Sequence, residues 1–79
     1  MNKVDLYVST LNSENTKKCY RRDIVAMLNF IGKAENNIKV IDMLMWKESL
    51  SSQSSATIAR KIAAVKMYFG FLHANKMIE

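Results

Sequence analysis

Proline is absent from this 79-residue sequence, and glycine occurs only twice. Long helices can therefore form without the kinks or breaks that proline introduces. Cysteine is represented by Cys19 alone and histidine by His73 alone. A single cysteine excludes a disulfide within the chain and makes a reducing cytoplasm the expected location. One cysteine and one histidine cannot supply the four ligands of a structural zinc site, so we expect no metal and no other cofactor.

Long apolar runs are also missing. No stretch approaches the roughly 20 residues that cross a bilayer, and the first residues lack the apolar stretch of a signal peptide. At this length residues 1–79 make one domain, without room for separate catalytic and binding domains. Cys19 and His73 have no supporting motif for nucleophilic catalysis. We therefore expect that this chain is not an enzyme.

Apolar residues recur with helical spacing in four segments of the chain. This spacing predicts helices over residues 3–11, 14–31, 40–49 and 55–74. Asn2 and Ser13 are the predicted N-caps of the first two helices, and Gly32 is the predicted C-cap of the second. The predicted fold class is all-α, a compact bundle of four to five short helices.

Two of these helices have more than one apolar face. In the third, Ile41 and Met45 favour one buried side, whereas Met43 and Trp46 favour another, and the pattern leaves the choice open. Residues 67–72 of the fourth helix are apolar nearly all round. A helix of that kind lies deep in a core or meets a partner on its far side.

Positive charge exceeds negative charge, with 12 Lys and Arg against 7 Asp and Glu. An excess of +5 favours an anionic partner, with nucleic acid as the first candidate and a membrane surface as the second. Four of these cations lie in the first turns of the second helix, at Lys17, Lys18, Arg21 and Arg22. Cations there oppose the helix dipole at a cost of about 0.3–1 kcal/mol. Together with exposed amides and nearby hydroxyls, however, they can bind a phosphate.

The start of the fourth helix repeats this arrangement. Both helix starts read S-x-x-T, at Ser13 to Thr16 and at Ser54 to Thr57, and basic residues follow each of them. Two such helix starts facing the same side would contact the phosphates on either side of a major groove. The competing interpretation is a solvated basic face, with Glu14 and Asp23 as local ion-pair partners.

Several motifs resemble a known family. Ser13-x-x-Thr16-x-x-x-Tyr20-Arg21-Arg22-Asp23-Ile24 is similar to that family's S-x-x-T-x-x-x-Y-x-x-D-L, and the segment from Thr57 to Phe69 is similar to its T-I-x-R-x-L-S-A-L-R-x-F-Y. The segment from Leu72 to Ile78 resembles Y-L-x-x-N/G-x-I. The chain thus resembles the N-terminal core-binding (SAM-like) domain of the tyrosine recombinase or phage integrase family.

This resemblance implies a DNA-binding domain for site-specific recombination and integration. Such a domain grips one side of a recombination half-site while a C-terminal catalytic domain holds the other. The implied partners are double-stranded DNA, that catalytic domain and other recombinase subunits on DNA, with no membrane. The positions that the resemblance places on DNA are Thr16, Lys17, Lys18, Arg21, Arg22, Ser55, Thr57, Arg60, Lys61 and Lys66.

The sequence departs from the family pattern in three places. Ala63 stands where the family often has serine, Asn75 replaces a common glycine, and the N-P linker is absent. The resemblance implies that the family's catalytic Arg, Lys, His-x-x-Arg and Tyr set belongs to a C-terminal domain, which we expect these 79 residues not to include. An alternative function is a helical protein-interaction module, in which Met67, Phe71 and the C-terminal tail receive another helix.

Overall fold

The computed structural model describes residues 2–78 and confirms an all-α fold for them. The α-helices are α1 (Lys3–Val8), α2 (Glu14–Ile31), α3 (Val40–Ser49) and α4 (Ser55–Ala74). A 3-10 turn, η1 (Glu35–Asn37), lies between α2 and α3. The bounds predicted for the last three helices are confirmed. Within the described residues, no helix is long and apolar enough to span a membrane.

The first helix is shorter than predicted, since it ends at Val8 rather than at residue 11. The hydroxyls of Ser9 and Thr10 donate hydrogen bonds to the carbonyls of Leu6 and Tyr7, at 2.6 and 2.7 Å. These bonds tie the chain into a turn, because Ser and Thr side chains compete with the helical backbone for its own acceptors. Apolar spacing alone did not reveal this competition.

Side-chain caps fix the starts of three helices. The side-chain oxygens of Asn2 and Ser13 accept the backbone N–H groups three residues further on, at 2.8 and 3.3 Å, which confirms both predicted caps. Ser54 caps α4 in the same way, at 3.2 Å. Gly32 ends α2 in the left-handed conformation with φ of 71°, which glycine adopts without strain.

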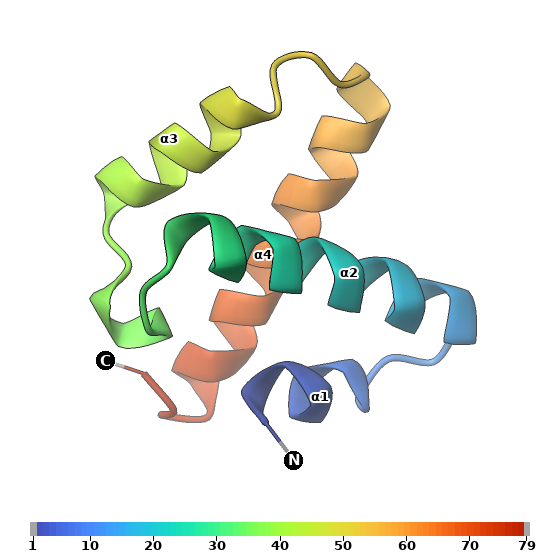
Figure 1. Ribbon diagram of the computed structural model, residues 1–79. Helices are drawn as coiled ribbons and strands as arrows, with labels where there is room; N and C mark the ends of the chain where they lie inside the picture. Colours follow the sequence, from blue (N-terminus) through green and yellow to red (C-terminus); the bar gives the residue numbers. More distant parts are fainter. Residues whose placement is uncertain (1, 79) are drawn as a thin grey trace.

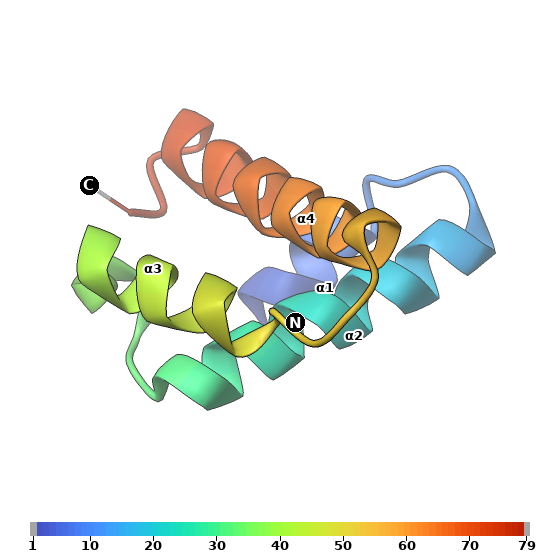
Figure 2. The same cartoon turned by 90° about the horizontal axis from the view of Figure 1, so that it is seen from above.

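The helices cross around one central pair. α2 passes in front of α4, and Figure 2 shows the two at different levels of the molecule. α1 packs against both, whereas α3 packs mainly against α2. Ile24, Tyr68 and Leu72 lie in a core cluster under α1, and Met27 and Val65 lie in a second cluster towards α3. The crossing of α2 and α4 therefore determines which sides of these two helices are buried and which remain exposed to solvent.

The buried side of α3, which the sequence left open, is the side that carries Met43, Trp46 and Leu50. Trp46 is only 4% exposed, and Met43 packs beside it. Ile41 and Met45 face solvent instead. The carboxylate of Asp42 accepts the backbone N–H of Lys39 at 2.9 Å and two hydrogen bonds from Lys33, and the backbone bond contributes most to lowering the pKa of Asp42.

The apolar second half of α4 is largely covered by the chain itself. The ring of Phe71 lies 5.3 Å from that of Tyr7, centre to centre. After α4 the backbone turns at Lys76, where φ is 55°, and Met77 and Ile78 return to the core. Of the predicted docking surface, Met67 is 55% exposed, whereas Phe71, Met77 and Ile78 are half-buried against the core, so a helix docked there stays a prediction.

The 3-10 turn is attached to the core by one polar contact. The hydroxyl of Tyr68 donates a hydrogen bond to the carboxylate of Glu35 at 2.6 Å. Burial, followed by this bond and the charge of Glu35, raises the pKa of Tyr68 well above its usual range. Burial also raises the pKa of Tyr7, whose hydroxyl has no hydrogen-bond partner within the described part of the chain.

Candidate nucleic-acid interface

The outward face of α2 carries three cations in its amino-terminal half. Lys18, Arg21 and Arg22 border one shallow hollow on this face. The side chains of Arg21 and Arg22 are 49% and 65% exposed. As predicted from the helical spacing, these cations point away from the buried stripe of α2.

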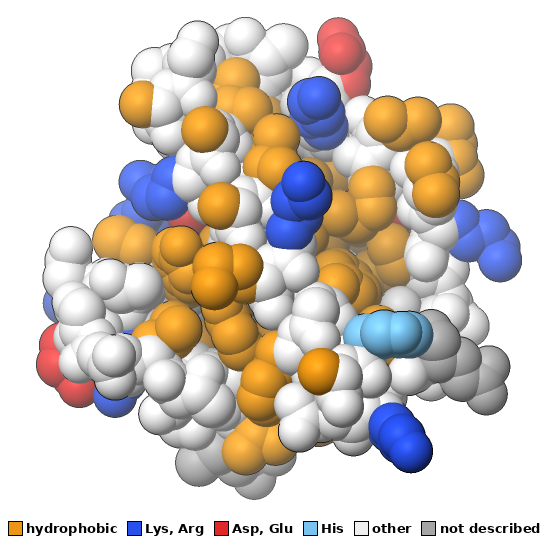
Figure 3. Space-filling model, turned by 180° about the vertical axis from the view of Figure 1, so that it is seen from behind, with side chains coloured by type: hydrophobic (Ala, Val, Ile, Leu, Met, Phe, Trp, Pro, Cys, Tyr) orange, Lys and Arg blue, Asp and Glu red, His pale blue; other side chains and the backbone are white. Residues whose placement is uncertain are grey.

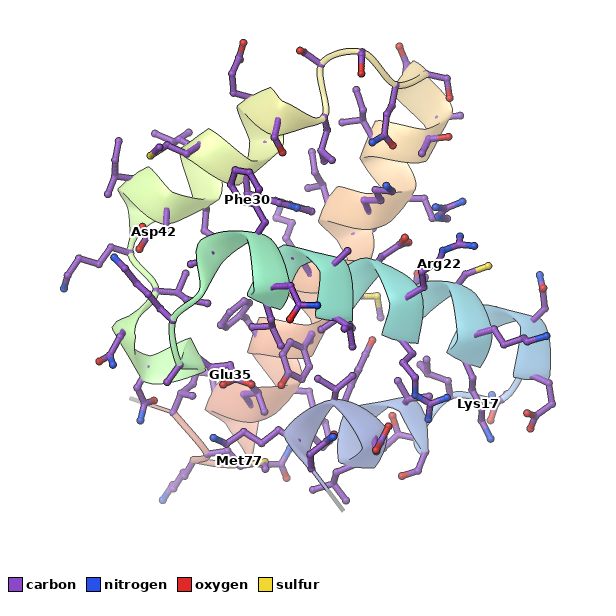
Figure 4. The ribbon with its side chains drawn as sticks, viewed as in Figure 1. Lys17, Arg22, Phe30, Glu35, Asp42 and Met77 are labelled. Atoms are coloured by element: carbon purple, nitrogen blue, oxygen red, sulfur yellow. The ribbon has the colours of Figure 1, made fainter. Side chains whose placement is uncertain are left out.

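Two cations of α2 have carboxylate partners on the side of α1. The Nζ of Lys17 lies 3.2 Å from a carboxylate oxygen of Glu14, which confirms the predicted local pairing of Glu14. The Nε of Arg21 donates to Asp5 at 2.9 Å. Figure 4 shows Lys17 and Arg22 pointing to opposite sides of α2, with Lys17 towards α1. Lys17 and Arg22 thus lie on opposite sides of α2, and Arg21 borders the outward hollow while its Nε bonds Asp5.

A buried carboxylate joins α2 to α4. Asp23 is 2% exposed, and its two oxygens accept hydrogen bonds from Nε and Nη2 of Arg60, at 3.1 and 3.3 Å. Arg22 approaches the same carboxylate, with its Nε 3.8 Å from Oδ1. We call Arg22, Asp23 and Arg60 the arginine junction. Because a bidentate contact fixes both partners, the junction sets the relative position of the two basic helix segments.

The arginine junction leaves donors free for a further anion. Arg60 uses only Nε and Nη2 for Asp23, and its side chain is 37% exposed. The hydrogen bonds and the charge of Asp23 raise the pKa of Arg60, so that this guanidinium stays charged. Two guanidinium groups from different helices therefore lie beside one carboxylate, each with N–H groups still directed elsewhere.

The hydroxyls at the two helix starts are used mainly for capping. Ser13 accepts the backbone N–H of Thr16, and the Ser54 hydroxyl also bonds the Thr57 hydroxyl at 2.9 Å. The S-x-x-T repeat is therefore a capping motif in both helices. Ser55 is exposed, and Thr16 and Thr57 are half-buried.

The two helices begin apart from each other. In Figure 1 the first turn of α4 lies at the upper right and that of α2 at the right edge, below it. Lys61 follows Arg60 and is half-buried. Lys66, by contrast, borders a hollow between α4 and α3, together with Met43 and Phe69. The structure thus places Lys18, Arg21 and Arg22 around one hollow and Arg60 beside Arg22, whereas Lys17 points towards α1 and Lys66 borders a different hollow.

Within residues 2–78, no group of three or more His, Cys, Asp or Glu side chains could hold a metal ion. Cys19 is a free, half-buried thiol on α2.

Two functional partners escaped the sequence analysis. Asp5 was not considered, and Asp23, besides the expected local pair with Arg22, binds Arg60 across 37 positions. Helical spacing carries no signal for such a distant pair. The resemblance did carry one, because Asp23 and Arg60 both occupy specified positions of its motifs.

Comparison with known proteins decides the family. The family described as "Phage integrase, N-terminal SAM-like domain" matches residues 4–76. The chain belongs to this family. A curated relative of the SAM-like domain is named "Tyrosine recombinase" and comes from Thermosipho africanus (strain TCF52B). It is 34% identical over 74 residues, which are 85% of this chain and 26% of the relative.

The SAM-like domain thus spans about a quarter of the length of that recombinase. No solved structure matched this chain in the comparison. The family membership confirms the resemblance stated from the sequence, and the match covers all four helices of the domain.

Proposed function

We propose that this SAM-like domain binds duplex DNA within a tyrosine recombinase and grips the recombination half-site mainly through phosphates. The observation that supports this most is the arginine junction. Asp23 holds Arg60 of α4 beside Arg22 of α2, and both guanidiniums keep donors for an anion. Contacts of this kind position a protein on DNA and carry little sequence information.

The proposed contact surface has a centre and two margins. Arg22 and Arg60 form the centre, and the exposed side chains of Lys18 and Arg21 extend it along α2. Ser55 and Thr57 belong to the first turn of α4, and Lys61 follows one turn later. Thr16 and Lys17 lie at the opposite margin, where Lys17 exchanges Glu14 for a phosphate. Lys66 is left out of this surface because it borders a different hollow.

We propose that the domain on its own binds duplex DNA and does not cleave it. In the whole recombinase, a separate catalytic domain would hold the other side of the half-site, and other subunits would lie on the same DNA. Two domains closing around a duplex share its phosphates, so the SAM-like domain alone is expected to bind weakly.

The salt dependence of DNA binding tests this proposal. About four to six phosphate contacts predict that log K falls with log salt at a slope of about −4 to −5. Fluorescence anisotropy of a labelled duplex, titrated over a series of KCl concentrations, measures that slope. Lys18→Ala removes one contact, so it should lower the slope by about 1 and weaken binding to all sequences alike.

Lys47→Ala is the matched control, since it removes the same charge from an exposed position of α3, outside the proposed surface. It should change the slope far less than Lys18→Ala. Equal effects of the two substitutions would mean that DNA responds only to net charge. A slope near zero would contradict phosphate binding altogether.

A further inference from the structure

An apolar groove lies between α3 and α4, which diverge from their short connection (Figures 1 and 2). Two hollows of about 420 and 230 Å³ follow each other along it, and Val40 and Met43 border both. Val65 and Phe69 of α4 line the larger hollow, and Ile62 lines the smaller one. We call this feature the α3–α4 groove. It exists because α3 packs mainly against α2 and leaves its other edge open.

The α3 side of the groove is made of exposed aliphatic side chains. Val40 is 77% exposed and Leu44 is 56% exposed, one helical turn apart. Ile41 and Met45 continue this apolar surface around α3, at 59% and 60%. Single exposed apolar residues are common on proteins, but four on two consecutive turns, of which Val40 and Leu44 border the hollows, indicate an interaction site.

Lysines surround the groove without carboxylates among them. Lys39 and Lys66 border the larger hollow, and Lys47 borders the smaller one. Within the described residues, no Asp or Glu lines either hollow. The nearby Asp42 is engaged by Lys33. Seen from behind, apolar side chains lie between α4 and α3 with basic side chains beside them (Figure 3).

We propose that the α3–α4 groove binds an amphipathic helix of a partner protein whose apolar face is flanked by Asp or Glu. An apolar face with anchors at i, i+3, i+4 and i+7 fits an elongated groove of this kind. The flanking carboxylates pair with Lys39, Lys47 and Lys66. This site shares no residue with the proposed DNA surface, so the inference does not rest on the proposed function, and both ligands bind at once.

The chemistry of the groove disfavours other occupants. Duplex DNA presents phosphates and polar base edges, which gain nothing from a floor of Val65 and Phe69. A second copy in a symmetric contact would bring the lysines of both grooves together, because a two-fold interface pairs each patch with itself. Charge complementarity therefore favours an acidic helix over the chain itself.

A designed peptide pair tests the proposal directly. The probe is a helical peptide with leucines at i, i+3, i+4 and i+7 and glutamates at the flanking positions. Its control has every glutamate replaced by lysine. Added to the ¹⁵N-labelled full chain, the acidic peptide should shift amide signals in residues 38–47 and 62–69. The basic peptide should bind at least about tenfold more weakly, which corresponds to about 1.4 kcal/mol.

Two variants separate this site from the DNA surface. Leu44→Asp places a carboxylate on the exposed rim, so the domain should stay folded and lose peptide binding by about tenfold or more. Lys66→Glu should weaken the acidic peptide and strengthen the basic one. Neither variant touches the arginine junction, and Leu44→Asp should change DNA affinity less than Lys18→Ala does.

Several outcomes would overturn the inference. They are equal binding of the two peptides, no shifts in the groove at millimolar peptide, and shifts that grow with protein concentration alone, which would indicate self-association. Binding of anionic phosphatidylglycerol vesicles through the groove without any binding of the acidic peptide would assign a membrane surface instead. If the domain binds the acidic peptide but does not bind DNA, only the proposed function is contradicted.

Discussion

Breaking the arginine junction should cost different amounts of folding free energy, depending on which partner is removed. Asp23 is buried, with its carboxylate side chain 1% exposed, whereas the side chain of Arg60 is 37% exposed. Arg60→Met leaves a buried carboxylate with only Arg22, at 3.8 Å, nearby. Asp23→Asn leaves a cation that can turn towards water. The first substitution should therefore be the more damaging one.

The magnitudes follow from this asymmetry. Leaving the buried Asp23 carboxylate without its bidentate partner costs about 2–4 kcal/mol, less than the roughly 3–5 kcal/mol of a fully buried pair, because Arg60 is 37% exposed and Arg22 remains nearby. Asp23→Asn keeps one acceptor oxygen for Arg60 and places an NH2 group opposite the second donor, so one hydrogen bond is weakened and the other is lost, for a loss of about 1–2 kcal/mol. A 79-residue domain is stable by only roughly 4–12 kcal/mol in total, so the loss for Arg60→Met is a substantial share of the folding free energy.

Urea denaturation followed by circular dichroism measures these losses, and the fluorescence of the buried Trp46 provides a second probe of the same transition. The double variant should lose less than the sum of the single losses, by about 1–2 kcal/mol, because both substitutions remove the same contact. A loss for Asp23→Asn that equals or exceeds that for Arg60→Met would refute the reasoning. So would strict additivity.

Three further predictions concern the other polar contacts. Asp5→Asn should free Arg21 and raise DNA affinity about two- to fivefold, as expected for an exposed pair, and unchanged anisotropy titrations would argue against this competition. The pKa of Asp42 is lowered in the fold, so its stabilising effect is present at neutral pH and is lost as the pH falls below about 4. The urea midpoint of Asp42→Asn should accordingly lie below that of the parent at pH 7 and approach it at pH 3, and a constant gap would contradict this. Because the pKa of Tyr68 is raised in the fold, its contribution to the free energy of unfolding is present below about pH 10 and is lost at higher pH. When unfolding is followed by circular dichroism, Tyr68→Phe should therefore lose less stability than the parent between neutral and alkaline pH.

Local signals were enough to predict most of the fold. The bounds of α2, α3 and α4 followed from apolar spacing, and the caps at Asn2, Ser13 and Gly32 followed from residue types with known backbone preferences. Each of these features depends on residues within one or two turns of each other. The end of α1 could not be predicted from spacing, because it depends on two hydroxyl contacts with the backbone.

Contacts between distant segments were beyond the sequence. The buried side of α3 depends on which edge meets α2, and two apolar faces of similar strength compete for that role in the sequence. The partial burial of Phe71 depends on the packing of α1 and of the C-terminal tail against α4. For the candidate site, the exposed cations of α2 were predictable from helical spacing. The link between Asp23 and Arg60, which brings the two helices together, was not.

The contact between Glu35 and Tyr68 also determines where the chain accepts insertions. The carboxylate of Glu35 accepts a hydrogen bond from the buried hydroxyl of Tyr68. Residues inserted beside Glu35 would move its carboxylate away from this hydroxyl and break the bond. The connection at Ser51, Ser52 and Gln53 is exposed and has no comparable anchor among the described contacts. A fluorophore, an affinity tag or new termini for circular permutation should therefore be placed at the serine-rich connection.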